Sequence, residues 1–93
     1  MQVEEAQFLA VNELAHRRET SVFWRNVKDL SEPHVVQETS EFWVFFARSE
    51  SLAEASHAPG GMFITVDKQT GRIWNRDEIE AYYTAKSYQP IAA

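Results

Sequence analysis

The run from Glu41 to Ser49, EFWVFFARS, constrains the fold of this chain more than any other segment. Side chains of a β-strand alternate between the two faces of a sheet. The alternation divides the run into two apolar sets, with Trp43, Phe45 and Ala47 on one face and Phe42, Val44 and Phe46 on the other. Because both faces are apolar, we expect this strand to lie in the centre of a sheet.

The rest of the chain supplies a single small domain around that strand. Its 93 residues suit one core, and a hydrophobic content of 44% with 13% aromatics lets the chain bury enough surface to fold without staples. It has no cysteine, which excludes disulfides, thiolate metal sites and cysteine nucleophiles. We therefore expect one domain over residues 1–93.

Further strands are predicted on both sides of the aromatic run. Residues 34–38 follow Pro33 and read as a strand, and residues 20–27, TSVFWRNV, are rich in β-branched and aromatic residues and are also interpreted as a strand. MFITVDKQTGRIW, residues 62–74, predicts a β-hairpin. In it Met62, Ile64 and Val66 share one face, and Asp67 and Gly71 make the turn.

Helices are expected at the two ends of the chain. Residues 2–17 contain strong helix formers, and their periodicity groups Val3, Ala6, Ala10, Val11 and Leu14 on one broad side.

A second helix over residues 76–86 should begin after Asn75, with Glu78 completing a capping box and Trp74 packing on Ile79, and residues 87–93 should fray. The fold class is thus α+β, with an antiparallel sheet of three to five strands within residues 20–75 and helices on one face of it. Residues 49–61 form a polar surface loop, a candidate contact site by position.

No residue pattern points to catalysis, a metal or a cofactor. His16, His34 and His57 lack the spacing of metal ligands, and no serine lies in a G-x-S-x-G motif. Glu78 and Glu80 are two apart on a helix and face different directions, which does not suit a pair of acid/base carboxylates. We expect a protein that is not an enzyme, with no catalytic residues, no metal and no cofactor.

The charge distribution favours a protein partner. The formal charge is −5, and residues 33–61 carry four acids against one base. Such a surface repels nucleic acid and anionic membranes and attracts a basic protein. The acids around the central strand are Glu32, Glu38, Glu41, Glu50 and Glu54. They form either a solvated rim that keeps the protein soluble or a docking surface for a basic partner.

A family resemblance accompanies these features. WVFFARS at residues 43–49 and VDKQTG at residues 66–71 resemble the aromatic strand and the V-D-K-x-T-G turn of the small bacterial YrhB-like proteins grouped with the immunity protein 35 family. The likeness spans residues 35–85. This chain departs from the pattern at residues 58–61, Ala-Pro-Gly-Gly, where the family has G-N-x-P.

The resemblance implies a cytoplasmic, non-enzymatic bacterial protein that binds and neutralises a cognate toxin. A start without a basic, apolar leader also suits the cytoplasm. The predicted partner-binding residues are Glu38, Glu41, Glu50 and Glu54, with Trp24 as an aromatic anchor; Asp67, Gly71, Trp74 and Asn75 are interpreted as structural. The alternative is a chaperone-like or adaptor module that binds unfolded or partner polypeptides through exposed apolar surface.

Overall fold

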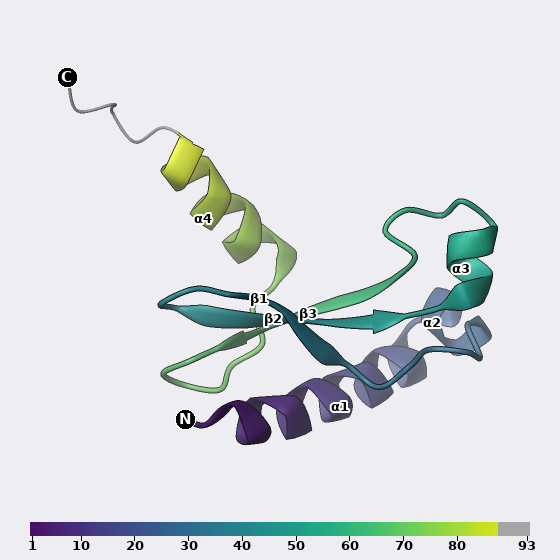
Figure 1. Cartoon of the computed structure of the whole chain (residues 1–93), viewed down its shortest axis with the longest axis horizontal. Helices are drawn as coiled ribbons and strands as arrows, with labels where there is room; N and C mark the ends of the chain where they lie inside the picture. Colours follow the sequence, from purple (N-terminus) through teal and green to yellow (C-terminus); the bar gives the residue numbers. More distant parts are fainter. Residues whose placement is uncertain (88–93) are drawn as a thin grey trace.

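The computed structural model of the chain describes residues 1–87 and has an α+β architecture (Figure 1). Its elements in chain order are α1 (Val3–Thr20), α2 (Val22–Asn26), β1 (His34–Glu38), β2 (Phe42–Arg48), α3 (Glu50–Glu54), β3 (Gly61–Asp67) and α4 (Arg76–Ser87). The predicted fold class is confirmed. Of the tail predicted to fray, Ser87 ends α4, and residues 88–93 lie outside the described residues.

The sheet has three antiparallel strands in the order β1-β2-β3. The central position predicted for the aromatic run is therefore confirmed. Val35 pairs with Phe45, and Phe45 with Ile64, so these three side chains share a face. The register of β1 shifts between Val35 and Gln37, where a bulge holds Val36.

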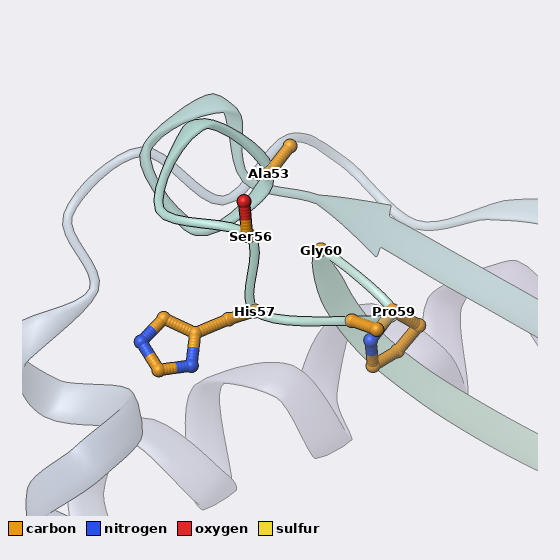
Figure 2. Close-up of a pocket in the computed structure, with 6 residues that line it drawn as sticks. Ala53, Ser56, His57, Pro59 and Gly60 are labelled. Carbon is orange, nitrogen blue, oxygen red and sulfur yellow. The ribbon is translucent and has the colours of Figure 1, made fainter.

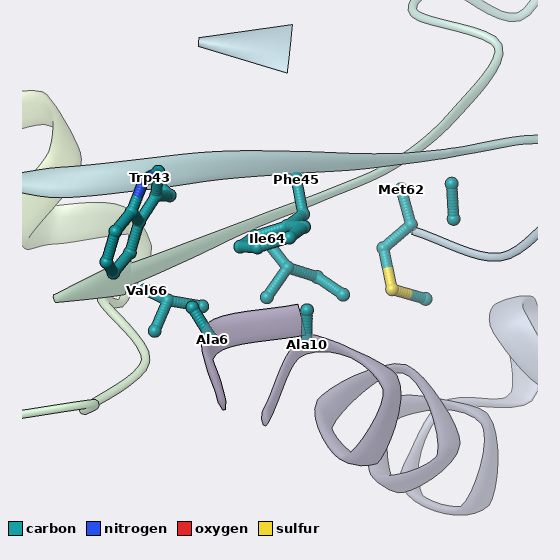
Figure 3. Close-up of a cluster of buried hydrophobic side chains, with 8 residues drawn as sticks. Ala6, Ala10, Trp43, Phe45, Met62, Ile64 and Val66 are labelled. Carbon is teal, nitrogen blue, oxygen red and sulfur yellow. The ribbon is translucent and has the colours of Figure 1, made fainter. Parts of the chain in front are cut away.

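One face of the sheet is buried under α1 (Figure 3). Ala6 and Ala10 of α1 are fully buried and point at the strands, and because their side chains are small the helix can approach the sheet closely. The core beneath them consists of Trp43, Phe45, Ala47, Met62, Ile64 and Val66. All three residues predicted to face the core from the hairpin do so.

Helix α1 is longer than predicted and carries apolar residues on both sides. It continues to Thr20, and the side chain of Val11, which we had grouped with the packing residues, is 38% exposed. Ala6 and Ala10 alone are fully covered, while Phe8 is turned outward and is 65% exposed. The helical layer expected on one face of the sheet is formed by α1, whereas α4 leaves the sheet on the other side (Figure 1).

The predicted strand at residues 20–27 is wrong, because this segment contains α2. Ser21 caps the helix, since its hydroxyl oxygen accepts a hydrogen bond from the backbone N–H of Trp24 at 3.4 Å. The aromatic residues of this segment favoured a strand by propensity. In the structure one of them, Trp24, packs against the core from a helix. In the following segment, Leu30 forms an isolated bridge with Ser49 and packs against the core.

A carboxylate anchors the segment after α2 to the start of α3. Asp29 accepts hydrogen bonds from the Ser49 hydroxyl at 2.6 Å and from the Ser51 backbone N–H at 2.8 Å and hydroxyl at 2.9 Å. These bonds, led by that from Ser49, lower the pKa of Asp29 to about 2. The loop over residues 49–61 therefore begins with an ordered helix.

The turn predicted in the hairpin is present, but the returning arm is not a full strand. Asp67 accepts hydrogen bonds from the backbone N–H groups of Gln69 and Thr70, and Gly71 has a φ of +73°. The return makes a single bridge, between Val66 and Ile73. The chain turns away after Trp74 because α4 begins at Arg76.

The start of α4 follows the prediction. The Asn75 side chain accepts a hydrogen bond from the Glu78 N–H at 2.9 Å, and Glu78 accepts one from the Asn75 N–H at 3.0 Å, which is a complete capping box. Trp74 packs its ring edge-on against Phe42 and Tyr82, with centroids 4.8 and 5.8 Å apart. The predicted contact of Trp74 with Ile79 stays a prediction.

Candidate protein-binding surface

The face of the sheet opposite α1 is apolar and only partly covered. Phe63 of β3 is 47% exposed and lies against Phe46 of β2, with ring centroids 4.7 Å apart. Because Phe46 and Phe63 are paired across neighbouring strands, their positions are set by the backbone ladder. We call this surface, with Phe46, Phe63 and the adjoining hollow between the sheet and α4, the open face.

A hollow of about 340 Å³ lies between the open face and α4. Its lining combines strand and helix residues, namely Gln37, Val44, Phe63, Thr65, Ile79 and Tyr83. The floor is formed by Val44 and Thr65, which are both buried, so the hollow has an apolar base with a hydroxyl at one point. A concave site with mostly apolar walls and a few polar groups suits recognition of a side chain from another molecule.

Helix α4 is held over this hollow by aromatic and tyrosine contacts. Tyr82 packs edge-on against Phe42 at 5.0 Å, and its hydroxyl donates to Glu41 at 3.2 Å. The Tyr83 hydroxyl donates to Gln37 at 3.4 Å. The capping box fixes where α4 begins, and the tyrosines fix which of its sides faces the sheet.

The two edges of the sheet differ in how they are protected. Arg17 of α1 donates a hydrogen bond to the backbone oxygen of Phe63 at 2.7 Å, and Trp74 donates its backbone N–H to Thr65 oxygen at 2.9 Å, so the outer edge of β3 is closed at both points. All residues of β1 are exposed, and the bulge at Val36 interrupts its regular pairing.

The four glutamates predicted to bind a partner do not form one patch. Glu38 and Glu41 lie at one end of β2, and Glu50 and Glu54 lie beyond the other end. At about 3.3 Å per residue, the seven residues of β2 separate the two pairs by about 20 Å.

Three of these glutamates also have partners within the chain. Glu38 pairs with Lys68 at 2.6 Å, and Glu50 pairs with Arg48 at 2.7 Å, which lowers the pKa of Glu50. Hydrogen bonds from the hydroxyls of Ser40 and Tyr82 lower the pKa of Glu41. Glu54 ends α3 and is exposed. The predicted acidic residues are thus present on the surface as two separate pairs.

Trp24 lies at the end of the molecule where α2 meets the loop after α3. It is half-buried, packs against the core and contacts Phe23 edge-on at 4.9 Å, while Phe23 is 53% exposed. A hollow of about 240 Å³ separates these two rings from the loop at residues 57–61. The structure therefore brings the predicted anchor close to the loop that we predicted as a contact site.

The same loop borders a second hollow, of about 290 Å³ (Figure 2). Its lining comes from α3 and the turn, with Ala53, Ser56, His57 and Gly60 among the residues drawn in Figure 2. The Gly60 backbone N–H donates to the His57 oxygen at 2.6 Å, and Gly60 has a φ of +81°. The His57 side chain is exposed and is the only ionisable group in this lining. Such a wall offers little to fix a charged ligand.

The described part of the chain brings together no group of three or more histidine, cysteine or acidic side chains that could hold a metal ion. His16, His34 and His57 lie on α1, β1 and the loop after α3. Within residues 1–87, none of the helices has the length and apolar character needed to cross a bilayer.

Sequence reasoning missed the residues that make the open face a site. Phe63 and Gln37 were not singled out, although Phe63 alternates with Met62 and Ile64 and so had to face away from the core. That alternation was the available signal. The position of α4 over Gln37 depends on contacts between residues 46 apart, which no local pattern reports.

No known protein family, curated protein or solved structure matches this chain. The resemblance to the YrhB-like and immunity protein 35 family therefore stays an expectation from the motifs at residues 43–49 and 66–71.

Proposed function

We propose that this protein is an immunity-type binding module that neutralises a basic bacterial toxin domain in the cytoplasm, and that the open face carries the contact. The observation that supports the proposal is the exposure of Phe63 on a rigid sheet, beside a hollow of about 340 Å³. Residues that bind a partner strongly are commonly aromatic and lie next to pockets that exclude water.

The open face suits binding better than an acidic surface alone. Exposed ion pairs contribute little to affinity because they are solvated and lose side-chain entropy when they form. An aromatic side chain that is already fixed on a strand loses little freedom on binding, and its apolar area is removed from water. Phe63 is exposed and is held on β3 by its contact with Phe46 of the neighbouring strand, so it meets both conditions.

In this proposal the acidic residues attract the basic partner towards the protein before contact. The net charge of −5 attracts a basic domain over a distance, and complementary charge raises the association rate more than it raises affinity. Glu41 and Glu50 lie beyond opposite ends of β2. Both have a lowered pKa and stay charged in mildly acidic solution. The toxin-neutralising class itself rests on the family resemblance.

The test begins with capture of the partner from the source bacterium by the tagged chain. The captured protein is then expressed alone and together with the chain in a growth assay. We expect the partner to stop growth when alone and the chain to restore it. A partner that is harmless when expressed alone, or a chain that fails to restore growth, contradicts the immunity function.

The assignment of the surface is tested by a matched pair of variants. Phe63→Asp places a charge in the centre of the open face and should abolish rescue. Phe23→Asp makes the same change at a residue of similar exposure on α2 and should leave rescue intact. Rescue that survives Phe63→Asp but is lost in Phe23→Asp overturns the open face and favours the surface around Trp24.

A chaperone-like function is the second candidate, and exposed aromatics on several surfaces favour it. Phe8 on α1, Phe23 on α2 and Phe63 on β3 are all more than 45% exposed and lie on different elements. A holdase would suppress the aggregation of several unrelated unfolded proteins at near-stoichiometric ratio. A single tight partner together with no such suppression favours the immunity function.

A further inference from the structure

The outer side of α1 is a second apolar surface, separate from the open face. Phe8 is 65% exposed and Val11 is 38% exposed, and Ala15 one turn further on is also exposed. Figure 1 shows α1 lying below the sheet with no other element along the side that faces away from it. The core needs only the opposite side of this helix.

The exposed residues follow a regular spacing along the helix. One row of side chains on this outer side occurs at intervals of four and three: Glu4, Phe8, Val11 and Ala15, which are exposed, and Arg18, which is partly exposed. This is the spacing of a and d positions, which form the contact stripe between paired helices. Over its 18 residues α1 is about 27 Å long, so the stripe extends along most of the helix.

The stripe is complementary to itself when read in the opposite direction. When a second copy of α1 is placed antiparallel and centred on Val11, Glu4 of one copy lies opposite Arg18 of the other, because each is seven residues from Val11. Phe8 falls near Ala15, so that a large side chain meets a small one. A surface that fits its own copy after a half-turn is what a two-fold dimer requires.

The two charged ends of the stripe lack partners within the chain. Among residues 1–87, neither Glu4 nor Arg18 makes an ion pair. Glu4 is exposed and Arg18 is partly exposed, so a carboxylate and a guanidinium are available at the two ends of the stripe. Beside Phe8 a hollow of about 450 Å³ has carboxylates at Glu4 and Glu5 on its border.

We propose that α1 pairs antiparallel with α1 of a second copy of this chain, forming a two-fold dimer. Val11 meets its counterpart at the centre, and Phe8 packs against Ala15 of the second copy. Glu4 of each copy binds Arg18 of the other, so two ion pairs close the ends of the contact. The charge of −5 on each chain opposes association, but repulsion between distant charges is screened beyond about 8 Å at physiological ionic strength.

Because α1 covers the face opposite the open face, this dimer leaves both open faces accessible. The dimer would present two binding surfaces directed away from each other. The proposal does not depend on the function assigned to the open face.

The test is a charge exchange followed by sedimentation of the whole chain, whose monomer mass is 10.8 kDa. The unchanged chain should sediment as a dimer of twice that mass. Glu4→Arg alone and Arg18→Glu alone should each raise the dimer dissociation constant at least about tenfold. The double variant with both changes should recover dimerisation, because the opposite charges then face each other in reversed order.

A second pair of variants separates dimerisation from folding. Phe8→Lys should give a folded monomer, since the side chain is 65% exposed, while Phe63→Lys on the other face should leave the dimer intact. Circular dichroism confirms folding in each case. A chain that is monomeric at about 1 mM, the weak end of specific association, overturns the proposal. A dimer that persists in Phe8→Lys also overturns it. The proposal is equally overturned if the double variant with exchanged charges does not dimerise.

Discussion

The two faces of the sheet are built from the same strands and differ in what covers them. On the α1 face, Phe45, Ile64 and Val66 are fully buried beneath the helix. On the open face, Phe63 keeps 47% of its surface exposed, although Met62 and Ile64 on either side of it in the sequence are buried. Helix α4 touches this face through Tyr82 and Tyr83 and leaves a hollow beneath it.

The difference separates residues that stabilise the fold from residues available for binding. An apolar side chain that the helix already covers contributes its burial to folding. One that stays exposed in the folded chain can contribute that burial only when another molecule covers it. Substitutions on the two faces measure how far these two roles are separated.

The largest contrast is expected from one substitution made on each face. Phe45→Ala should lower the free energy of unfolding by about 3–5 kcal/mol, because it leaves a cavity in the closed core. Phe63→Ala should lower it by less than about 1 kcal/mol, since half of the side chain is already in water. Urea unfolding of the two variants measures the contrast, and equal losses would mean that the faces are not energetically distinct.

The closeness of α1 to the sheet is tested by enlarging a small residue. Ala10→Leu should cost about 1–3 kcal/mol, because Ala10 is fully buried and a longer side chain must push the helix away. Ala81→Leu, the same change at an exposed position of α4 outside the α1 stripe, is the control and should leave stability unchanged. Thermal unfolding monitored by circular dichroism compares the two variants.

The contribution of the Asn75 cap to the stability of α4 over the open face can be tested by substitution. Asn75→Ala removes the acceptor for the Glu78 N–H and should destabilise the start of α4 by about 1 kcal/mol. Amides of α4 should then exchange faster with solvent, while those of β2 and β3 keep their protection. Hydrogen exchange measured by mass spectrometry reports both regions, and equal acceleration of the strands would contradict separate stabilities.

The smallest effect is expected from acid, at a contact that belongs to neither face. The pKa of Asp29 falls from 3.8 in the unfolded chain to about 2 in the folded protein, so its charged form favours folding. This contribution is complete above about pH 4 and is lost as the pH falls towards 2. Asp29→Asn should lower the melting temperature at pH 7 and make it less sensitive to pH over that interval. An unaltered pH dependence in differential scanning calorimetry would contradict the anchoring role.

The sequence predicted the elements whose causes are local. The central strand followed from two apolar faces in residues 42–47, and the cap of α4 from Asn75 and Glu78 at the correct spacing. The segment at residues 20–27 was misassigned because Ser21 caps a helix, and tertiary packing of Trp24 outweighs strand propensity.

The candidate site was less predictable because it depends on which apolar face remains uncovered. The alternation of β3 shows that Phe63 points away from Ile64, but it does not say which of the two is covered by a helix. The glutamates were visible in the sequence, yet only the length of β2 shows that they form two separate pairs. Contacts between Tyr83 and Gln37, which frame the hollow, join distant parts of the chain.

The central claim, that the open face is the binding surface, is tested most directly by calorimetric titration of the captured partner with the unchanged chain, Phe63→Asp and Phe23→Asp. We predict that Phe63→Asp weakens binding at least about tenfold, as expected for a residue at the centre of an interface, while its unfolding midpoint stays close to that of the unchanged chain. Phe23→Asp should bind as the unchanged chain does. Equal affinity for all three proteins, or a loss confined to Phe23→Asp, would contradict the account.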